Sequence, residues 1–169
     1  MRKMFILDGY NVIYRIPELT AKLKESLEEA RRALAVRMAD WKRSRVNADV
    51  IIVFDGRDSV FPDSSRMNVC GIKCVYTATK ETADDRIISM VRLSEEPSRI
   101  TVISDDNQIR NSSRAHGARI EYSAFFETAG RKKSKTAERP DKAFDARKNR
   151  SVTDYYEGYL RSKGKISEE

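Results

Sequence analysis

Acidic side chains follow three apolar runs of the sequence, in a pattern suited to metal-dependent phosphate chemistry. The polar residues that close these runs are Asp8 after residues 4–7, Asp55 after residues 50–54, and Ser104, Asp105 and Asp106 after residues 100–103. If the runs are parallel strands of one sheet, their carboxylates gather at its carboxyl edge, where open α/β sheets bind ligands. Carboxylates that share an edge repel each other unless a cation lies between them. Because Mg²⁺ and Mn²⁺ prefer oxygen ligands, the pattern predicts a divalent-metal site.

Two further acids, Asp84 and Asp85, stand at the start of a predicted helix. Thr82 precedes them, and a threonine followed three residues later by an acid is typical of a helix N-cap. An acidic first turn also suits the positive end of the helix dipole, so a structural role is the alternative to metal binding. Asp106 leaves the same choice between a further acid of the site and a helix cap.

The order of the predicted elements favours a mostly parallel sheet with helices on both faces. Residues 17–43 carry apolar side chains three and four apart, which predicts one long amphipathic helix. Residues 69–76 are predicted to form one strand at or near an edge, with Cys70 and Cys74 as small buried apolar side chains. We expect this domain to occupy residues 1–130.

The remaining residues, 131–169, form a predicted basic C-terminal extension that is partly helical or disordered. They contain twelve Lys and Arg against seven Asp and Glu, and so hold most of the chain's net charge of +7. An excess of positive charge favours a nucleic-acid partner, and the aromatic patch at 152–160 suits stacking on unpaired bases. The alternative is an extension that packs back on the domain through that patch. The candidate RNA-binding residues are Arg57, Arg66, Arg131, Lys132, Lys133 and Lys135. For the first two, which lie in or near a polar loop, an ordinary surface loop is the alternative.

Several function classes lack their signatures in this sequence. Neither the phosphate-binding loop G-x-x-x-x-G-K-[ST] nor the dinucleotide fingerprint G-x-G-x-x-G is present. A haloacid-dehalogenase-type phosphatase requires a second acid two residues after the first, where this chain has Tyr10. No apolar run is long enough to span a membrane, and we expect a cytoplasmic protein.

The motifs together resemble the NYN domains of the YacP type, bacterial relatives of the PIN-like ribonucleases. The resemblance covers roughly residues 4 to 128 in the expected order. Its motifs are Asp8-Gly9-Tyr10-Asn11-Val12-Ile13, Val53-Phe54-Asp55, Val75-Tyr76-Thr77 leading to Glu81-Thr82-Ala83-Asp84, and Ser104-Asp105. It implies a Rossmann-like fold whose five-stranded sheet has the order 3-2-1-4-5. It also implies a Mg²⁺- or Mn²⁺-dependent endoribonuclease, in the best-known case one that acts on translated mRNA at the ribosome.

Carried over by position, the resemblance assigns Asp8, Asp84 and Asp105 as the metal-site acids. Asp8 and Asp105 are the expected direct ligands, and Asp84 is a ligand or a positioner of the attacking water. Asn11 and Asp55 match the family's accessory polar positions, and Asn11 would hold the scissile phosphate or orient Asp8. Ser104 would support Asp105, and Asp85 and Asp106 are further accessory candidates outside the family's pattern. A non-catalytic RNA- or ribosome-binding module on the same fold is the alternative function.

Overall fold

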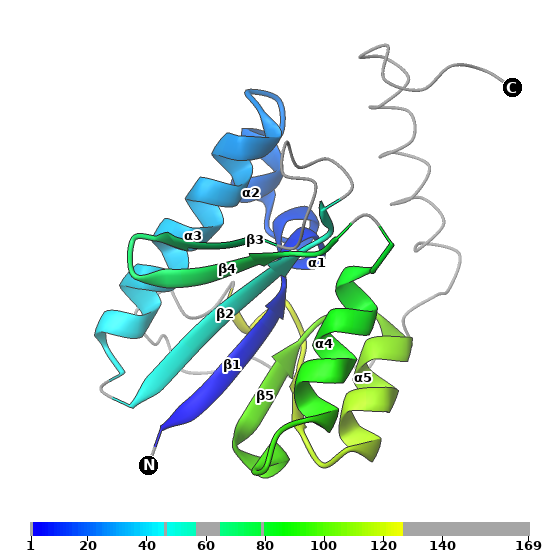
Figure 1. The fold of residues 1–169 in the computed structure, drawn as a ribbon. Coiled ribbons are helices and arrows are strands. Elements are labelled where there is room, and N and C mark those ends of the chain that lie inside the picture. The colour runs from blue at the N-terminus through cyan, green and yellow to red at the C-terminus, as the bar shows by residue number, and fades with distance from the viewer. Residues whose placement is uncertain (1, 46, 57–64, 79, 127–169) are drawn as a thin grey trace, which may run out of the picture. The chain divides into compact units, whose positions relative to one another are not determined.

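The structure is a computed structural model, and a six-stranded sheet forms the centre of its fold (Figure 1). The structure describes residues 2–45, 47–56, 65–78 and 80–126. The strand order across the sheet is β3-β4-β2-β1-β5-β6. All neighbouring strands are parallel except β3 and β4, which are antiparallel. The strands are β1 Lys3–Asp8, β2 Ala48–Phe54, β3 Ser65–Val69, β4 Ile72–Tyr76, β5 Ile100–Ile103 and β6 Arg119–Glu121.

The predicted α/β fold is confirmed, and the strand count is corrected from five to six. The five predicted strands correspond to β1, β2, β4, β5 and β6, which lie in the predicted order, and β3 is added at the edge. The predicted strand 69–76 is wrong, because a turn interrupts it. Cys70 and Gly71 both have positive φ, 53° and 80°, which suits the two-residue turn of a hairpin. Cys70 is consequently exposed, and only Cys74 is buried as predicted.

Three helices precede β2, where the sequence predicted one. They are α1 Gly9–Arg15, α2 Pro17–Lys22 and α3 Leu27–Arg43. The predicted helix 17–43 is broken before Leu27 because Ser26 is extended and caps α3, accepting a hydrogen bond from the Glu29 N–H at 3.0 Å. The later helices are α4 Ala83–Arg92 and α5 Asn107–Ala115, with a short 3₁₀ helix η2 Pro97–Arg99 before β5.

The helices cover the sheet from both sides, so that alternate residues of each strand enter different cores. Leu7 and Ile52 pack in the core beneath α1, α2 and α3. Ile6 and Ile51 face the opposite core, beneath α4 and α5. Figure 1 shows α2 and α3 on one side of the sheet and α4 and α5 on the other. Burial on both faces explains the uninterrupted apolar runs that end on acidic residues.

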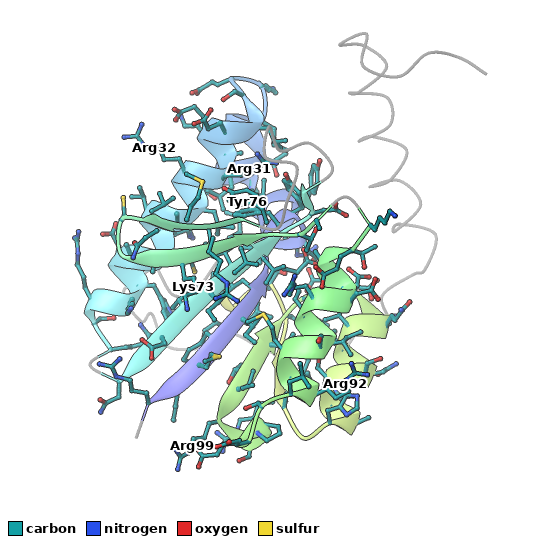
Figure 2. The ribbon with its side chains drawn as sticks, in the orientation of Figure 1. Arg31, Arg32, Lys73, Tyr76, Arg92 and Arg99 are labelled. Carbon is teal, nitrogen blue, oxygen red and sulfur yellow. The ribbon has the colours of Figure 1, made fainter. Side chains whose placement is uncertain are left out.

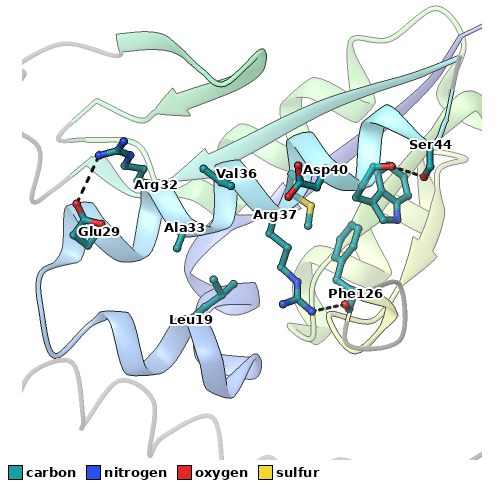
Figure 3. Close-up of a pocket in the computed structure, with 11 residues that line it drawn as sticks. Leu19, Glu29, Arg32, Ala33, Val36, Arg37, Asp40, Ser44 and Phe126 are labelled. Carbon is teal, nitrogen blue, oxygen red and sulfur yellow. Dashed lines mark hydrogen bonds and ion pairs between the residues drawn. The ribbon is translucent and has the colours of Figure 1, made fainter. Parts of the chain in front are cut away.

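The described chain ends against α3. Arg37 of α3 donates a hydrogen bond to the carbonyl oxygen of Phe126 at 2.9 Å (Figure 3). Trp41 packs edge-on against the rings of Phe5, Phe125 and Phe126, with centroids 4.8 to 6.1 Å away. These contacts fix the segment after β6, which passes the carboxyl edge of the sheet. The predicted boundary at residue 130 lies outside the described residues. Within the described ranges, no helix has the length and apolar character needed to cross a membrane.

Candidate active site at the carboxyl edge of the sheet

Asp8 is the central acid of this edge. It ends β1 and caps α1, and its side chain is largely buried, with 8% of the residue exposed. Oδ1 accepts a hydrogen bond from the Asn11 N–H at 3.2 Å, and Oδ2 accepts one from the Ser104 hydroxyl at 3.4 Å. Gly9 makes this position available, since a Cβ there would lie 2.3 Å from the ring of Phe54. The tight turn from strand to helix therefore holds the carboxylate at the sheet edge.

The surroundings of Asp8 disfavour its charged form. Burial is the largest cause, and it raises the pKa of Asp8 from 3.8 to about 7. The hydrogen bond from Asn11 lowers the pKa, whereas the nearby charges of Asp84 and Asp106 raise it. A cation at this place would reverse the balance, because it would favour the charged carboxylate.

Asp84 reaches the same edge from the first turn of α4. Thr82 caps this helix as predicted, accepting a hydrogen bond from the Asp85 N–H at 3.1 Å. The pKa of Asp84 is raised, first by burial and then by the charges of Asp106, Asp85 and Asp55. Asp85 is exposed and also accepts a hydrogen bond from the Thr82 hydroxyl at 2.8 Å. Asp85 thus serves the helix start, and Asp84 faces the other acids.

Asp106 is both a helix cap and a member of the acidic cluster. Its Oδ1 accepts hydrogen bonds from the N–H groups of Gln108 at 2.7 Å and Ile109 at 3.0 Å, which caps α5. Its charge also raises the pKa values of Asp8 and Asp84. The cap that the sequence offered as one role of Asp106 is therefore present, and its charge also acts on Asp8 and Asp84.

Asp105 is adjacent but is held by different partners. Its Oδ1 accepts a hydrogen bond from the Ser123 N–H at 2.9 Å, and its Oδ2 lies 3.9 Å from Nε of Arg15. Asn11 links Asp8 to Asp105. Its N–H donates to Asp8, and its Oδ1 accepts hydrogen bonds from the Asp105 N–H at 3.2 Å and the Ser123 hydroxyl at 3.4 Å. Ser104 donates to Asp8 rather than to Asp105, and accepts from the Asp106 N–H at 3.1 Å.

Ser123 and Arg15 belong to the site but were not predicted. Ser123 comes two residues after β6, so the rule that polar residues follow parallel strands could have found it. Arg15 stands four residues after Asn11 in α1, on the same side of that helix, but the sequence analysis did not identify this helix.

The other predicted residues lie at the margin or outside the described residues. Asp55 follows β2 and is half-buried, and its charge raises the pKa of Asp84. Gly56 beside it donates a hydrogen bond to the Thr77 hydroxyl at 2.9 Å, which ties this end of β2 to the residue after β4. Arg66 is exposed in β3, not in the loop where it was predicted. The predicted contacts of Arg57, Arg131, Lys132, Lys133 and Lys135 lie outside the described residues.

The chemistry of the donor set fits a hard divalent cation. Asp8, Asp84 and Asp106 supply carboxylate oxygens, and their mutual repulsion is relieved by positive charge. Among the residues that the structure describes, no group of three or more His, Cys, Asp or Glu side chains is arranged so that it could hold a metal ion. Mg²⁺ and Mn²⁺ keep several waters and can be bound through one or two protein carboxylates.

Comparisons with known proteins agree with this fold. The family model for the YacP-like NYN domain matches residues 5–163. The chain belongs to this family. This match confirms the resemblance found in the sequence. NYN domains are part of a nuclease superfamily. The match extends well beyond residue 128 and so includes most of the basic extension.

Individual proteins resemble part of this chain or its fold. The chain is similar to the uncharacterized protein YacP of Bacillus subtilis (strain 168), with 34% identity over 84 residues. These residues cover 50% of this chain and 48% of YacP, so the match spans about half of the relative's length. The fold is similar to a crystal structure of Rae1 (YacP) from Bacillus subtilis, with a TM-score of 0.58, 23% identity, and coverage of 95% of this chain and 83% of that one. A mutant of Rae1 gives a TM-score of 0.59 at 22% identity, covering 98% and 86%.

Proposed function

We propose that the protein is a Mg²⁺- or Mn²⁺-dependent endoribonuclease that hydrolyses phosphodiester bonds in RNA. One observation carries the proposal: the buried carboxylate of Asp8, at the carboxyl edge of the sheet, has a pKa of about 7 and faces other acids. Such a group is unfavourable for stability, and perturbed carboxylates in this position are typical of functional sites. Membership in a family of nucleases gives the acids a chemical purpose.

In this proposal Asp8 and Asp84 hold the metal ion. A bound Mg²⁺ or Mn²⁺ would supply a water of lowered pKa and neutralise the charge that develops on the phosphate. Asp84 is half-buried on α4. It would also accept a hydrogen bond from the attacking water and so orient the oxygen of that water toward the phosphorus. Asp55, Asp85 and Asp106 add negative charge around these two acids and thereby strengthen the attraction for a cation.

Asn11 and Arg15 would bind the substrate phosphate. The Asn11 carbonyl oxygen is fixed by the Asp105 N–H and the Ser123 hydroxyl, so its amide nitrogen is oriented as a hydrogen-bond donor. Arg15 lies beside Asp105 with about half of its side chain exposed, and its guanidinium suits a phosphate oxygen. Both groups stand on one side of α1, next to Asp8.

Asp105 is proposed as the third acid, through Oδ2. Its other oxygen is bound by the Ser123 N–H, which fixes the orientation of the carboxylate. Asp106 is the competing candidate, since it is Asp106 and not Asp105 that acts on the pKa values of Asp8 and Asp84. Substitution of each acid separates the two assignments, as described in the Discussion.

The proposed partner is single-stranded RNA, specifically mRNA in the context of the ribosome, as the resemblance implies. The basic residues Arg131, Lys132, Lys133 and Lys135 would contact RNA phosphates. Each phosphate contact adds about 0.7 to the slope of log affinity against log salt concentration for a single strand. Replacing these four residues by Gln in the full chain should therefore flatten the slope by up to roughly 3 and leave turnover at saturating RNA unchanged. An unaltered slope would argue against these contacts.

The alternative function is a non-catalytic RNA- or ribosome-binding module. Its support is that no group of three or more His, Cys, Asp or Glu side chains in the described part of the chain could hold a metal ion. The deciding experiment incubates labelled RNA with the protein in Mn²⁺, in Mg²⁺ and in chelator, and separates the products by gel electrophoresis. Cleavage that requires either metal supports the nuclease. RNA that binds and stays intact in both metals supports the binding module.

A further inference from the structure

Tyr122 is an exposed aromatic side chain at the edge of the candidate site. Half of its surface, 50%, is accessible, whereas most large apolar side chains of the described residues are buried. It follows β6 directly and therefore stands at the carboxyl edge of the sheet, together with the acids. Its ring belongs to neither core of the described residues, so it lies at the surface beside the acids.

Arg110 holds one side of the tyrosine. Its guanidinium carbon lies 3.9 Å from the centre of the Tyr122 ring, a close cation–π contact. Arg110 is itself fixed, because Nη1 donates a hydrogen bond to Oδ1 of Asn107 at 3.1 Å. It stands one helical turn after Asp106, to whose carbonyl oxygen its N–H donates at 3.1 Å. The ring is thus held by a cation that comes from the same edge.

The main chain connects Tyr122 to the phosphate-binding side of the site. The next residue, Ser123, is buried and donates hydrogen bonds to Asp105 from its N–H and to Asn11 from its hydroxyl. The ring of Tyr122 is therefore attached to a rigid element of the site rather than to a loose loop. A nucleotide whose phosphate meets Asn11 would carry its base, or the base of its neighbour, toward this ring.

A second arginine–aromatic cluster, around Arg31, serves the core instead. Arg31 lies 5.4, 5.7 and 5.3 Å from the ring centres of Tyr10, Phe54 and Tyr76. Figure 2 shows Arg31 directed toward Tyr76. Phe54 and Tyr76 are buried and stack on each other at 5.4 Å, which leaves these rings no accessible face for a ligand.

We propose that Tyr122 and Arg110 together form a stacking site for one unpaired RNA base next to the cleaved phosphate. This inference rests on the proposed function, since it assumes that RNA lies along the acidic edge. The ring would stack on the base, as aromatic residues do in proteins that bind single-stranded nucleic acids, and Arg110 would attract the adjoining phosphate. The site would favour unpaired over paired RNA, because an unpaired base is free to place its face on the ring. It would have no strong sequence preference, because every base has an aromatic face.

The test measures binding in chelator, so that cleavage does not contribute. A short single-stranded RNA carries 2-aminopurine at successive positions, and its fluorescence reports stacking while the anisotropy of an end label reports affinity. Tyr122→Leu removes the ring and should weaken binding by roughly 5- to 100-fold, the usual loss for one stacked base, while Tyr122→Phe should bind like wild type. Leu93→Ala is the matched control, because Leu93 is exposed at the far end of α4 from Asp84.

A second variant keeps the test decisive if Tyr122→Leu does not fold. Tyr122→Trp adds a second tryptophan to a chain that has only Trp41, and the new fluorescence should be quenched by unmodified RNA. Equal affinity of wild type, Tyr122→Phe and Tyr122→Leu, or a new tryptophan that saturating RNA does not quench, would overturn the inference. Metal-dependent cleavage by Tyr122→Leu with an unchanged KM would overturn it while leaving the nuclease proposal intact. Ring-dependent binding without cleavage in any metal would overturn the nuclease proposal and leave the stacking site intact.

Discussion

The two edges of the sheet carry acidic residues in opposite electrostatic situations. At the amino edge, Asp49 of β2 lies between Arg2 at 3.6 Å and Lys42 at 3.7 Å. At the carboxyl edge, Asp8 and Asp84 face other acids, and their pKa values are raised. The acid at the first edge has cations beside it, whereas Asp8 and Asp84 at the second edge are repelled by neighbouring acids. The comparison teaches that an acid's surroundings, rather than its presence, mark the carboxyl edge as the place where a cation would be held.

The largest expected effect is the loss of cleavage when the central acid of the carboxyl edge is removed. Asp8→Asn keeps the shape and the hydrogen-bonding oxygen of the side chain but removes the negative charge. Because a catalytic metal stabilises transition-state charge by several kcal/mol, we expect cleavage to fall by about a hundredfold or more. The rate of RNA cleavage in saturating Mn²⁺ measures this. Cleavage by Asp8→Asn within about threefold of wild type would remove Asp8 from the metal site.

The second prediction concerns stability and pH. The pKa of Asp8 is about 7 in the folded state against an ordinary value of 3.8, so the folded protein binds more protons than the unfolded chain between these values. Stability must then fall as pH rises from about 4 to 7, by at most roughly 4 kcal/mol for this group. In chelator, Asp8→Asn should be more stable than wild type at pH 8, and the difference should shrink toward pH 5.

Urea unfolding of both proteins at the two pH values measures the difference in the free energy of unfolding. Saturating Mn²⁺ at pH 8 should stabilise wild type by preferential binding to the folded state and should not stabilise Asp8→Asn. A difference between the two proteins that is the same at pH 5 and pH 8 would mean that Asp8 does not carry the pH dependence.

The third prediction separates the neighbours Asp105 and Asp106. Asp105→Asn retains an oxygen for the Ser123 N–H, so its stability should stay close to that of wild type while cleavage is lost, if Asp105 is a ligand. Asp106→Asn retains the cap of α5, because Asn is a good N-cap, and should lower the pKa of Asp8 by removing a charge. Asp106→Ala should also lose about 1 kcal/mol of stability, as for other lost caps.

Cleavage assays and melting temperatures of the three variants together give the assignment. Full cleavage by Asp105→Asn, together with loss of cleavage in Asp106→Asn, would transfer the role of third acid to Asp106. Loss of cleavage in both variants would place both acids at the metal site.

The sequence was sufficient to predict the frame that brings the acids together. Apolar runs that end on Asp8, Asp55 and Asp105 indicated buried parallel strands, because only strands covered on both faces lack alternation. The caps at Thr82 and Asp106 were also visible, since side chains that cap helices occur in a fixed local spacing. These features depend on residues that are close together in the sequence, so local sequence patterns predict them.

The features that the sequence did not reveal depend on contacts or on backbone conformation. The hairpin at Cys70 requires a non-glycine residue with positive φ, which residue type alone does not predict. The break before Leu27 was hidden because the apolar spacing continues across it, and only the extended backbone of Ser26 ends the pattern. The partners of Asp105 come from α1 and from the segment after β6, so its environment is set by tertiary contacts.

The smallest expected effect comes from the amino edge, and it completes the comparison. Asp49→Asn removes the charge between Arg2, which is exposed, and Lys42, which is partly exposed, so the ion pairs should contribute only about 0 to 1 kcal/mol. Unlike Asp8→Asn, this variant should be slightly less stable than wild type at pH 8, and the loss should shrink in high salt. Cleavage should be unchanged, because the proposed metal site lies at the opposite edge. Unfolding in low and high salt, together with the cleavage assay, measures both effects. A stabilised Asp49→Asn protein would show that acids at both edges are equally unfavourable, and the distinction that assigns the metal to the carboxyl edge would fail.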